Sequence, residues 1–194
     1  MNTTTKLIDI YHGDVITSFH DLYAAGILGC YIKATQGATY VDPNFTDNAA
    51  RAASVGMIKT GYGFFVPDDD PVQQAQHLVN VANPKAGDLP LILDVETAGA
   101  NVGANALVAA QEIKRLTGWY PWIYSGESFY GQYLAEFFPA ADYNLIIANY
   151  SEQPKMACAM WQNSESGRLV GCENNVDTDI FFGSLADLRV LCTK

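Results

Sequence analysis

Short apolar segments alternate with amphipathic segments along most of the chain. Eight of the apolar segments have the length and the β-branched or aromatic content of strands. They are Leu7–Tyr11, Gly29–Lys33, Met57–Phe65, Leu91–Val95, Trp122–Tyr124, Leu145–Tyr150, Met160–Gln162 and Val176–Phe181. The pattern therefore predicts eight strands.

Helical segments are expected between the first six of these strands and nowhere after the sixth. Two signals mark the helix ends: glycines that suit a left-handed residue after a helix, and an N-cap at Asp70, with Pro71 at the first helical position and Gln73 where a capping box needs it. The expected helices are Ser18–Ala25 before Gly26, Phe45–Val55 before Gly56, one starting at Pro71, Ala104–Thr117 before Gly118, and Ser128–Phe138.

Five strand–helix units followed by three strands without helices are typical of a barrel with an incomplete helical ring. The sequence thus predicts an α/β fold, a single irregular TIM-like (β/α)5β3 barrel formed by one domain over residues 1–194. In such barrels the chemistry lies where strands end and the following loops begin.

Composition narrows the possible functions. Hydrophobic residues make up 49% of the 194 residues and charged residues 16%, which excludes a disordered chain. No apolar run approaches the roughly 20 residues of a membrane helix, so we expect no membrane insertion. The formal net charge of −10 would repel phosphates, so we expect no nucleic-acid partner.

The cysteines and histidines do not form a recognisable metal or catalytic motif. Cys30 lies in an apolar stretch and is expected in the core, whereas a disulfide among Cys158, Cys172 and Cys192 stays open. The cysteines form no CxxC pair, which argues against a zinc site. The wide spacing of His12, His20 and His77 argues against a metal centre or a nucleophilic triad.

The acidic run Asp68–Asp70 has two interpretations. It could bind calcium, but it precedes a helix, where carboxylates cap the first turn and favour the positive end of the helix dipole. The capping interpretation is favoured.

Asp94 and Glu96 end the apolar run Leu91–Val95. Residues two apart on a strand point to the same side, so the two carboxylates project together at the rim while Val95 faces the helices. One of two adjacent carboxyls in a partly dry site should have a raised pKa, as a general acid needs. Alone, such a pair is more often a solvated or capping feature.

Two further acids strengthen the functional interpretation. Asp9 interrupts the apolar first strand, and Asp177 lies in the last strand, where Asp179 shares its face and competes for the same role. The first and last strands of a closed barrel are neighbours. Asp9 and Asp177 are therefore expected to converge beside the pair on the fourth strand.

Five aromatic residues near strand ends could stack on sugar rings. They are Tyr62, Phe64, Tyr124, Tyr150 and Trp161. Core packing is the default for aromatic side chains, so at least two of the five are expected to be core residues.

Several motifs, in this order, resemble glycoside hydrolase family 25, the Chalaropsis-type lysozymes common among phage endolysins. They are Ile8-Asp9-Ile10, Tyr31–Gly37, Tyr40–Phe45, Leu93–Glu96, Tyr120–Ser125, Met160-Trp161-Gln162 and Val176-Asp177. The resemblance runs nearly end to end and implies a flattened barrel of eight strands and five helices.

The resemblance also implies an N-acetylmuramidase that works without a metal or another cofactor. Glu96 would be the general acid/base, supported by Asp9, Asp94 and Asp177, and the bond after N-acetylmuramic acid would be cleaved with net retention. Lys33 and Gln162, inside matching motifs, join the five aromatic residues as expected substrate-binding residues.

The expected partner is bacterial peptidoglycan. We expect the protein to be a monomer that consists of the catalytic domain, without a separate wall-binding domain. The polar start of the chain has no secretory signal pattern. We therefore expect synthesis in the cytoplasm and action on the cell wall after phage-assisted release.

The sequence departs from the family pattern at three positions. Phe64 replaces a histidine, Ile146 replaces a tryptophan, and Asn163 replaces a tyrosine. Two alternatives stay open: a glycan-binding or phage structural module that has lost turnover, and a chitinase-like barrel. The second would need further acids on the Leu91–Leu93 strand, which has none.

Overall fold

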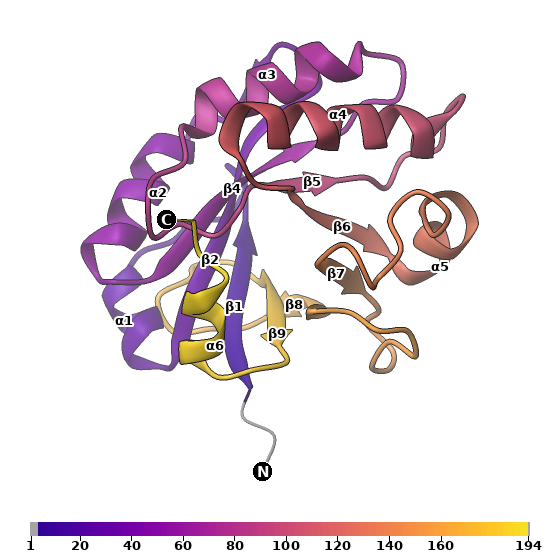
Figure 1. Cartoon of the computed structure of the whole chain (residues 1–194). Coiled ribbons are helices and arrows are strands. Elements are labelled where there is room, and N and C mark those ends of the chain that lie inside the picture. The colour runs from indigo at the N-terminus through magenta and orange to yellow at the C-terminus, as the bar shows by residue number, and fades with distance from the viewer. Residues whose placement is uncertain (1–3, 194) are drawn as a thin grey trace.

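The computed structural model describes residues 4–193 and shows a closed barrel flanked by helices (Figure 1). The barrel strands are β1 (Thr5–Ile10), β2 (Ile27–Gln36), β4 (Ile58–Phe64), β5 (Ile92–Asp94), β6 (Trp122–Gly126), β7 (Leu145–Ala148), β8 (Met160–Gly167) and β9 (Val176–Phe181). A short extra strand, β3 (Tyr40–Val41), pairs with the end of β2. The predicted α/β barrel of eight strands is confirmed.

The direction of strand pairing sets the place of the chemistry. Strands β1, β2, β4, β5, β6, β7 and β8 run parallel around the barrel, and β9 closes it antiparallel to both β8 and β1. All seven parallel strands therefore end at one mouth of the barrel. Asp9 of β1 pairs directly with Asp177 of β9 at this mouth.

Six α-helices pack around the barrel. They are α1 (Phe19–Ala24), α2 (Phe45–Ser54), α3 (Pro71–Ala82), α4 (Val102–Thr117), α5 (Glu127–Phe129) and α6 (Leu185–Val190). Figure 1 shows α3 and α4 side by side over the strands of the first half of the chain, whereas β8 and β9 are less covered.

Two helix predictions were wrong. Helix α6 follows the last strand, where no helix was expected; its signal is a capping box between Ser184 and Asp187, but its six residues are too short for a periodic pattern. The expected helix Ser128–Phe138 is α-helical only at its start, because α5 continues into a π-helical turn at Tyr130–Leu134.

The predicted N-cap at Asp70 and the predicted glycine helix ends are confirmed, whereas the helix at Asp70 shows no return bond from the Gln73 side chain that would complete a capping box. The side chain of Asp70 accepts a hydrogen bond from the backbone N–H of Gln73 at 2.9 Å, and Ser18 caps α1 in the same way. The acidic run therefore caps a helix, as the favoured interpretation expected. Gly118 ends α4 with φ +85°, a conformation that side-chain-bearing residues rarely adopt.

The apolar core has two layers. Side chains between the strands and the helices, Val95 among them, form the outer layer, and those inside the barrel form the inner layer. The inner layer includes Leu7, Ile58, Ile92, Trp122, Ile146 and Met160. Alternate residues of each strand thus fill the barrel, which is a packed core with no pore.

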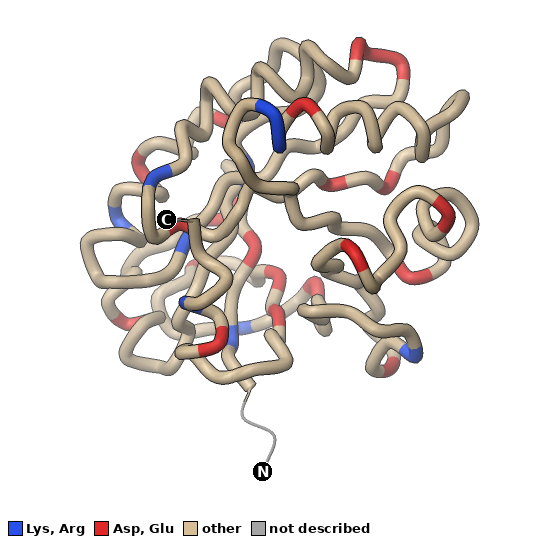
Figure 2. The backbone as a smooth tube through the Cα atoms, in the orientation of Figure 1, with Lys and Arg blue, Asp and Glu red and all other residues tan. Residues whose placement is uncertain are grey.

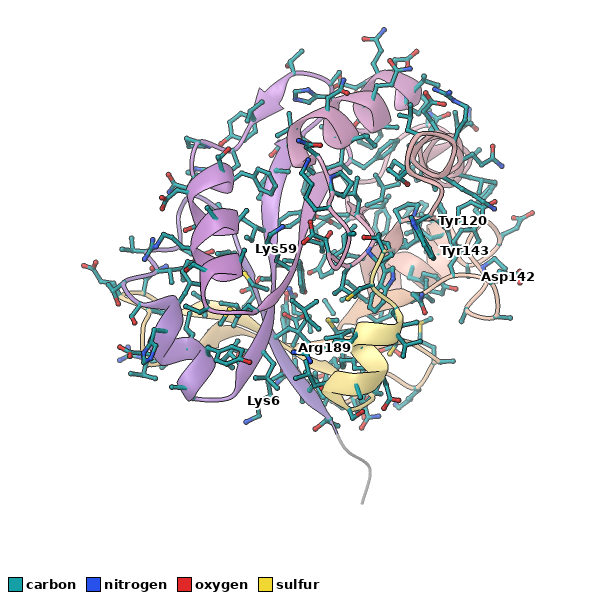
Figure 3. The ribbon with its side chains drawn as sticks, turned by 60° about the vertical axis from the view of Figure 1, so that its left-hand side comes forward. Lys6, Lys59, Tyr120, Asp142, Tyr143 and Arg189 are labelled. Carbon is teal, nitrogen blue, oxygen red and sulfur yellow. The ribbon has the colours of Figure 1, made fainter. Side chains whose placement is uncertain are left out.

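Polar and aromatic contacts join the loops at the opposite, N-terminal end of the barrel. Lys59 on β4 forms an ion pair with Asp88 at 2.8 Å, and Tyr120 packs edge to face against Tyr143 with ring centroids 5.1 Å apart (Figure 3). These contacts connect the segments that lead into β5, β6 and β7. They make this end a rigid base for the mouth.

Three further properties concern residues 4–193. All four cysteines are free thiols, so the disulfide left open among Cys158, Cys172 and Cys192 is absent. Every helix in this range is too short or too polar to span a bilayer. Figure 2 shows acidic residues distributed along the whole fold, with the fewer basic residues scattered among them.

Candidate active site

The acidic pair Asp94 and Glu96 lies at the mouth of the barrel. Asp94 is the last residue of β5 and is only 6% exposed, whereas Glu96 lies two residues further on and is exposed. The segment between them is bound to β6: the backbone of Val95 donates to Tyr124 at 3.0 Å and accepts from the Ser125 hydroxyl at 2.8 Å. These bonds fix the backbone between the two carboxylates.

Both carboxyls of the pair are pushed toward their protonated forms. Burial raises the pKa of Asp94 well above its ordinary value, and the negative charge of Glu96 raises it further. Partial burial also raises the pKa of Glu96. The Lys33 ammonium lowers the pKa of both groups. The pair therefore favours a state that holds one proton.

A second acidic group stands on the neighbouring strands β1 and β9. Burial raises the pKa of Asp9 well above its ordinary value, and the charges of Asp179, Asp177 and Asp94 raise it further. Burial, aided by nearby carboxylates that include Glu96, raises the pKa of Asp177 to about 6. The two acidic groups thus lie within electrostatic reach of each other across the mouth, as the sequence predicted.

Asp179 occupies a deeper position than Asp177. Its side chain is only 1% exposed, and one carboxyl oxygen accepts a hydrogen bond from the Tyr31 hydroxyl at 2.5 Å. The other oxygen has no partner among residues 4–193, and burial raises the pKa of this carboxyl well above its ordinary value. Asp179 therefore supports the floor of the mouth, while Asp177 faces the opening.

Gln162 connects the second acidic group to two tyrosines. Its amide nitrogen donates to Asp9 Oδ2 at 3.0 Å and to Asp177 Oδ2 at 3.4 Å. Its amide oxygen accepts from the hydroxyls of Tyr124 at 2.7 Å and Tyr150 at 2.8 Å. Because the side chain is fully buried, these four bonds fix the amide and, through it, the two carboxylates.

The aromatic candidates divide between core and mouth. Tyr62 and Tyr124 are buried inside the barrel, which confirms that at least two of the five are core residues. Phe64 is partly buried beneath Lys33, whose ammonium lies 5.0 Å from the ring centroid. Trp161 is partly buried, and Tyr150 is 47% exposed. The last three thus keep part of their ring surface accessible, unlike Tyr62 and Tyr124.

A hollow of about 510 Å³ lies beside Glu96. Glu127, Phe129, Asn149 and Ser151 contribute to its walls. The amide of Asn149 donates to Glu127 at 2.6 Å, and its backbone oxygen accepts from the Trp161 indole at 2.7 Å. The space next to Glu96 therefore has polar walls of fixed orientation that a sugar could contact.

Sequence reasoning missed several residues of this site. Asp14 is buried near the mouth and accepts from the amide of Asn174, Tyr31 holds Asp179, and Asn149 and Glu127 line the hollow. Tyr31 and Asn149 lie in segments that are otherwise apolar, so their partners on distant strands gave no local signal. Asp14 follows the first strand in a polar loop, which is typical of a solvated turn.

The arrangement suits proton transfer and stabilisation of positive charge. Asp94 and Glu96 both have raised pKa values, Glu96 borders open space, and further carboxyls stand around the mouth. Within the part of the chain that the structure describes, no three His, Cys, Asp or Glu side chains are grouped as a metal site.

The chain is similar to several known proteins. It is 30% identical to YegX of Escherichia coli (strain K12) over 82% of this chain, and it spans 61% of the length of that relative. It is 27% identical to the N,O-diacetylmuramidase of Chalaropsis sp, with 98% of this chain and 100% of the relative covered. The lysozyme structure from Streptomyces coelicolor superposes with a TM-score of 0.89 at 24% identity, covering 99% of this chain and 98% of the other.

A family match includes three of the four acidic residues proposed for the site. The sequence profile of glycosyl hydrolases family 25 matches residues 8–172, a range that contains Asp9, Asp94 and Glu96. This range is well over half of the chain, and the barrel agrees with the lysozyme fold. The chain therefore belongs to glycosyl hydrolases family 25.

Proposed function

We propose that this protein is an N-acetylmuramidase that hydrolyses the β-1,4 bond between N-acetylmuramic acid and N-acetylglucosamine in bacterial peptidoglycan. The observation that carries the proposal is the Asp94–Glu96 pair at the mouth, beside an open hollow and opposite Asp9 and Asp177. Family membership and the names of the relatives, lysozyme and muramidase, support the same substrate.

Glu96 is the proton donor in this proposal. Its carboxyl is exposed to the hollow and has a raised pKa, so it holds a proton in reach of a glycosidic oxygen. The proton moves to the leaving oxygen as the bond from that oxygen to the anomeric carbon breaks. Glu96, now ionised, then takes a proton from the water that attacks the anomeric carbon.

Asp94 acts on the other side of the reaction. Net retention needs two displacements at the anomeric carbon, and two routes supply the first nucleophile. Either the Asp94 carboxylate attacks and forms a glycosyl–enzyme ester, or the 2-acetamido oxygen of the substrate attacks and Asp94 orients and stabilises that group. Replacing the acetamido group of the substrate with a trifluoroacetamido group should lower the rate of hydrolysis strongly if the second route operates and only slightly if the first does.

The remaining residues bind and position. Asp177, whose pKa of about 6 leaves it largely ionised at neutral pH, adds negative charge that stabilises the positive sugar ring of the transition state, and Asp9, bound by the same Gln162 amide, helps to position it. Phe64, Tyr150 and Trp161 offer ring faces or edges to the glycan, and Lys33 holds the pair partly ionised.

Digestion of purified peptidoglycan, followed by identification of the new reducing ends, tests the proposal. Muramic acid ends are expected, and their initial anomeric form, followed by NMR, should be β. Glucosamine ends would assign another specificity, and an initial α product would replace retention by inversion. The absence of new ends would identify a glycan-binding module without turnover.

A further inference from the structure

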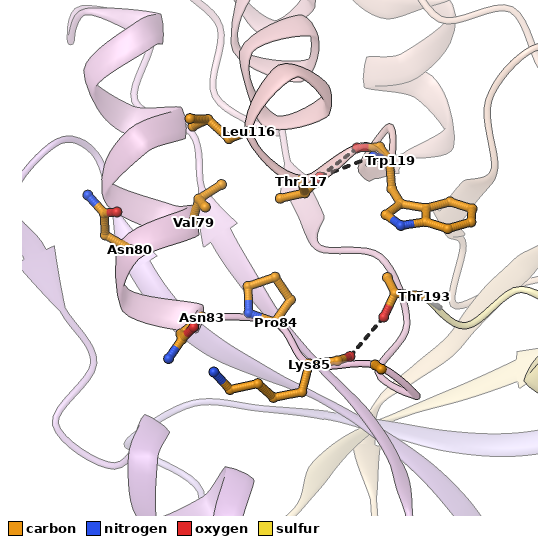
Figure 4. Close-up of a pocket in the computed structure, with 10 residues that line it drawn as sticks. Val79, Asn80, Asn83, Pro84, Lys85, Leu116, Thr117, Trp119 and Thr193 are labelled. Carbon is orange, nitrogen blue, oxygen red and sulfur yellow. Dashed lines mark hydrogen bonds between the residues drawn. The ribbon is translucent and has the colours of Figure 1, made fainter.

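A second hollow, of about 590 Å³, lies at the opposite end of the barrel from the acids (Figure 4). It is bounded by the C-terminal ends of α3 and α4, by the segment that follows α3, and by Thr193. These segments lead into β5 and β6, whereas Asp94 and Glu96 lie where β5 ends. Its volume is within the range of about 300–1,000 Å³ typical of ligand pockets.

Trp119 is the main aromatic residue of this hollow. It is 38% exposed, although a tryptophan is normally buried more fully in a packed domain. The Thr117 hydroxyl donates to the Ile113 carbonyl at 2.8 Å, inside α4, and accepts from the backbone N–H of Trp119 at 3.2 Å. The turn that carries the indole is therefore fixed before any ligand arrives.

The residue after Trp119 adds to this rigidity. Tyr120 packs against Tyr143, and the Lys114 ammonium lies 4.0 Å from the Tyr120 ring centroid (Figure 3). An exposed indole on such a support costs little conformational entropy when it stacks on a ligand.

The other walls combine apolar and uncharged polar groups. Val79, Pro84 and Leu116 form an apolar surface, while the exposed amides of Asn83 and Asn80 lie at the edge of the hollow, that of Asn80 on the outer side of α3 (Figure 4). The C-terminal ends of α3 and α4 add backbone carbonyl groups, which accept hydrogen bonds. An indole, aliphatic carbons and amides together match a sugar ring that carries hydroxyl and acetamido groups.

The charge of the hollow differs from that of the whole protein. Among residues 4–193, Lys85 is the only charged residue that lines it, and Lys114 and the Glu112-paired Arg115 lie in the last turn of the adjoining α4. Figure 2 shows blue at this end of α4. In a chain of net charge −10, this region avoids repulsion from an anionic polymer.

We propose that this hollow is a second glycan-binding site, which holds a peptidoglycan strand through its N-acetylated sugar rings while the mouth cleaves another. This inference rests on the proposed function, since the ligand is the same polymer as the substrate. Trp119 stacks on one ring, the apolar surface of Val79, Pro84 and Leu116 contacts its neighbour along the strand, and Lys85 faces the lactyl carboxylate of muramic acid. The site would keep the enzyme close to the cell wall after it has arrived there.

A binding experiment in the Glu96→Gln background tests the site without consuming the ligand. The probe is immobilised glycan strands from which an amidase has removed the stem peptides. Trp119→Ala should weaken binding by about fivefold, the loss expected for one aromatic contact. Phe182→Ala is the matched control, because Phe182 is 39% exposed and does not line the hollow; it should bind as the parent does.

Hydrolysis of a short soluble fragment, which fills the mouth alone, separates the two proposals. Trp119→Ala in the otherwise native protein should cleave it at the native rate and cleave insoluble peptidoglycan more slowly. Equal binding of the peptide-free strands by Trp119→Ala and Phe182→Ala would overturn the second site. The second site would also be overturned if Trp119→Ala weakened binding only to strands that keep their stem peptides. Failure of the native protein to cleave any peptidoglycan would overturn the proposed function, whatever the binding result.

Discussion

The two acidic groups of the mouth differ in how their carboxyls are held. Asp9, Asp177 and Asp179 receive hydrogen bonds from Gln162 and Tyr31, which fix their positions. Asp94 Oδ1 has no donor among residues 4–193, and the exposed Glu96 borders the hollow. Of two groups with similar charge, the one on β1 and β9 is built into the structure, and the one on β5 is left open to a ligand.

This difference assigns different work to chemically similar residues. A carboxyl that changes protonation during a reaction must be free to meet both substrate and water, whereas one that provides a constant field works best when it is fixed. The strand that carries an acid is thus less informative about its role than the donors around it. The following predictions test this division, from the largest expected effect to the smallest.

Glu96→Gln should give the largest loss of activity. The amide cannot donate a proton to the leaving oxygen, so turnover on peptidoglycan should fall by about 10²–10⁴-fold, with the melting temperature nearly unchanged. Glu165→Gln is the matched control: Glu165 is also exposed near the mouth, on β8, and its variant should keep nearly native turnover. Similar losses in both would show that general negative charge matters more than the donor.

Asp94→Asn should lower turnover and shift the alkaline limb of the pH–rate profile. That limb follows loss of the proton that the pair retains: the charge of Glu96 raises the pKa of Asp94, and by the same repulsion an ionised Asp94 would oppose ionisation of Glu96. Removing the charge should therefore move the limb to lower pH. An unmoved limb would mean that Asp94 only orients the substrate, and an upward shift would make burial the controlling effect.

Gln162→Met should lower turnover by about tenfold and move the acidic limb to higher pH. The amide donates to the charged forms of Asp9 and Asp177, so its loss makes both harder to ionise. The pKa of Asp177, already raised to about 6, should rise further. The pH dependence of kcat/KM measures this shift. A loss of turnover with an unchanged acidic limb would indicate a packing role for Gln162.

The barrel itself was predictable because each strand carries a local apolar pattern. Asp9 and Asp177 could be paired from sequence, since barrel closure makes the first and last strands neighbours, and the register confirms this. Helix α6 and the π-helical turn were not predicted from the sequence, because α6 is too short to show a periodic pattern and the π-helical turn disturbs the helical period. The cross-barrel bonds between Tyr31 and Asp179, and from Gln162 to its four partners, depend on side chains far apart in sequence and left no local signal.

The buried acids should make stability fall as pH rises. A carboxyl with a raised pKa binds its proton more tightly in the folded protein, so its stabilising effect is present at low pH. That effect is lost between the unfolded value of about 4 and the raised value. For Asp177 this window runs up to about 6. Urea unfolding across this range should show a decreasing free energy of unfolding, and Asp179→Asn should flatten the decrease. Parallel curves would show that Asp179 is not held protonated.

Tyr150→Phe should have the smallest effect. It removes one of two hydroxyl donors to the amide oxygen of Gln162 and leaves Tyr124 in place. Turnover should fall by about threefold or less, the equivalent of one hydrogen bond of about 0.5 kcal/mol, without a shift of either pH limb. A larger fall in kcat/KM on long glycans than on short fragments would show that the exposed ring also contacts sugar.

The most direct test of the division between the acids uses a muramyl glycoside with an activated aryl leaving group, which departs without protonation. The rate of aryl release in the first turnover, before water has to attack the anomeric carbon, is measured for Glu96→Gln and Asp94→Asn. If Glu96 serves as the proton donor, Glu96→Gln should recover to within about tenfold of the native rate, while Asp94→Asn should stay slow. Recovery of Asp94→Asn, or equal losses in both variants, would contradict the account.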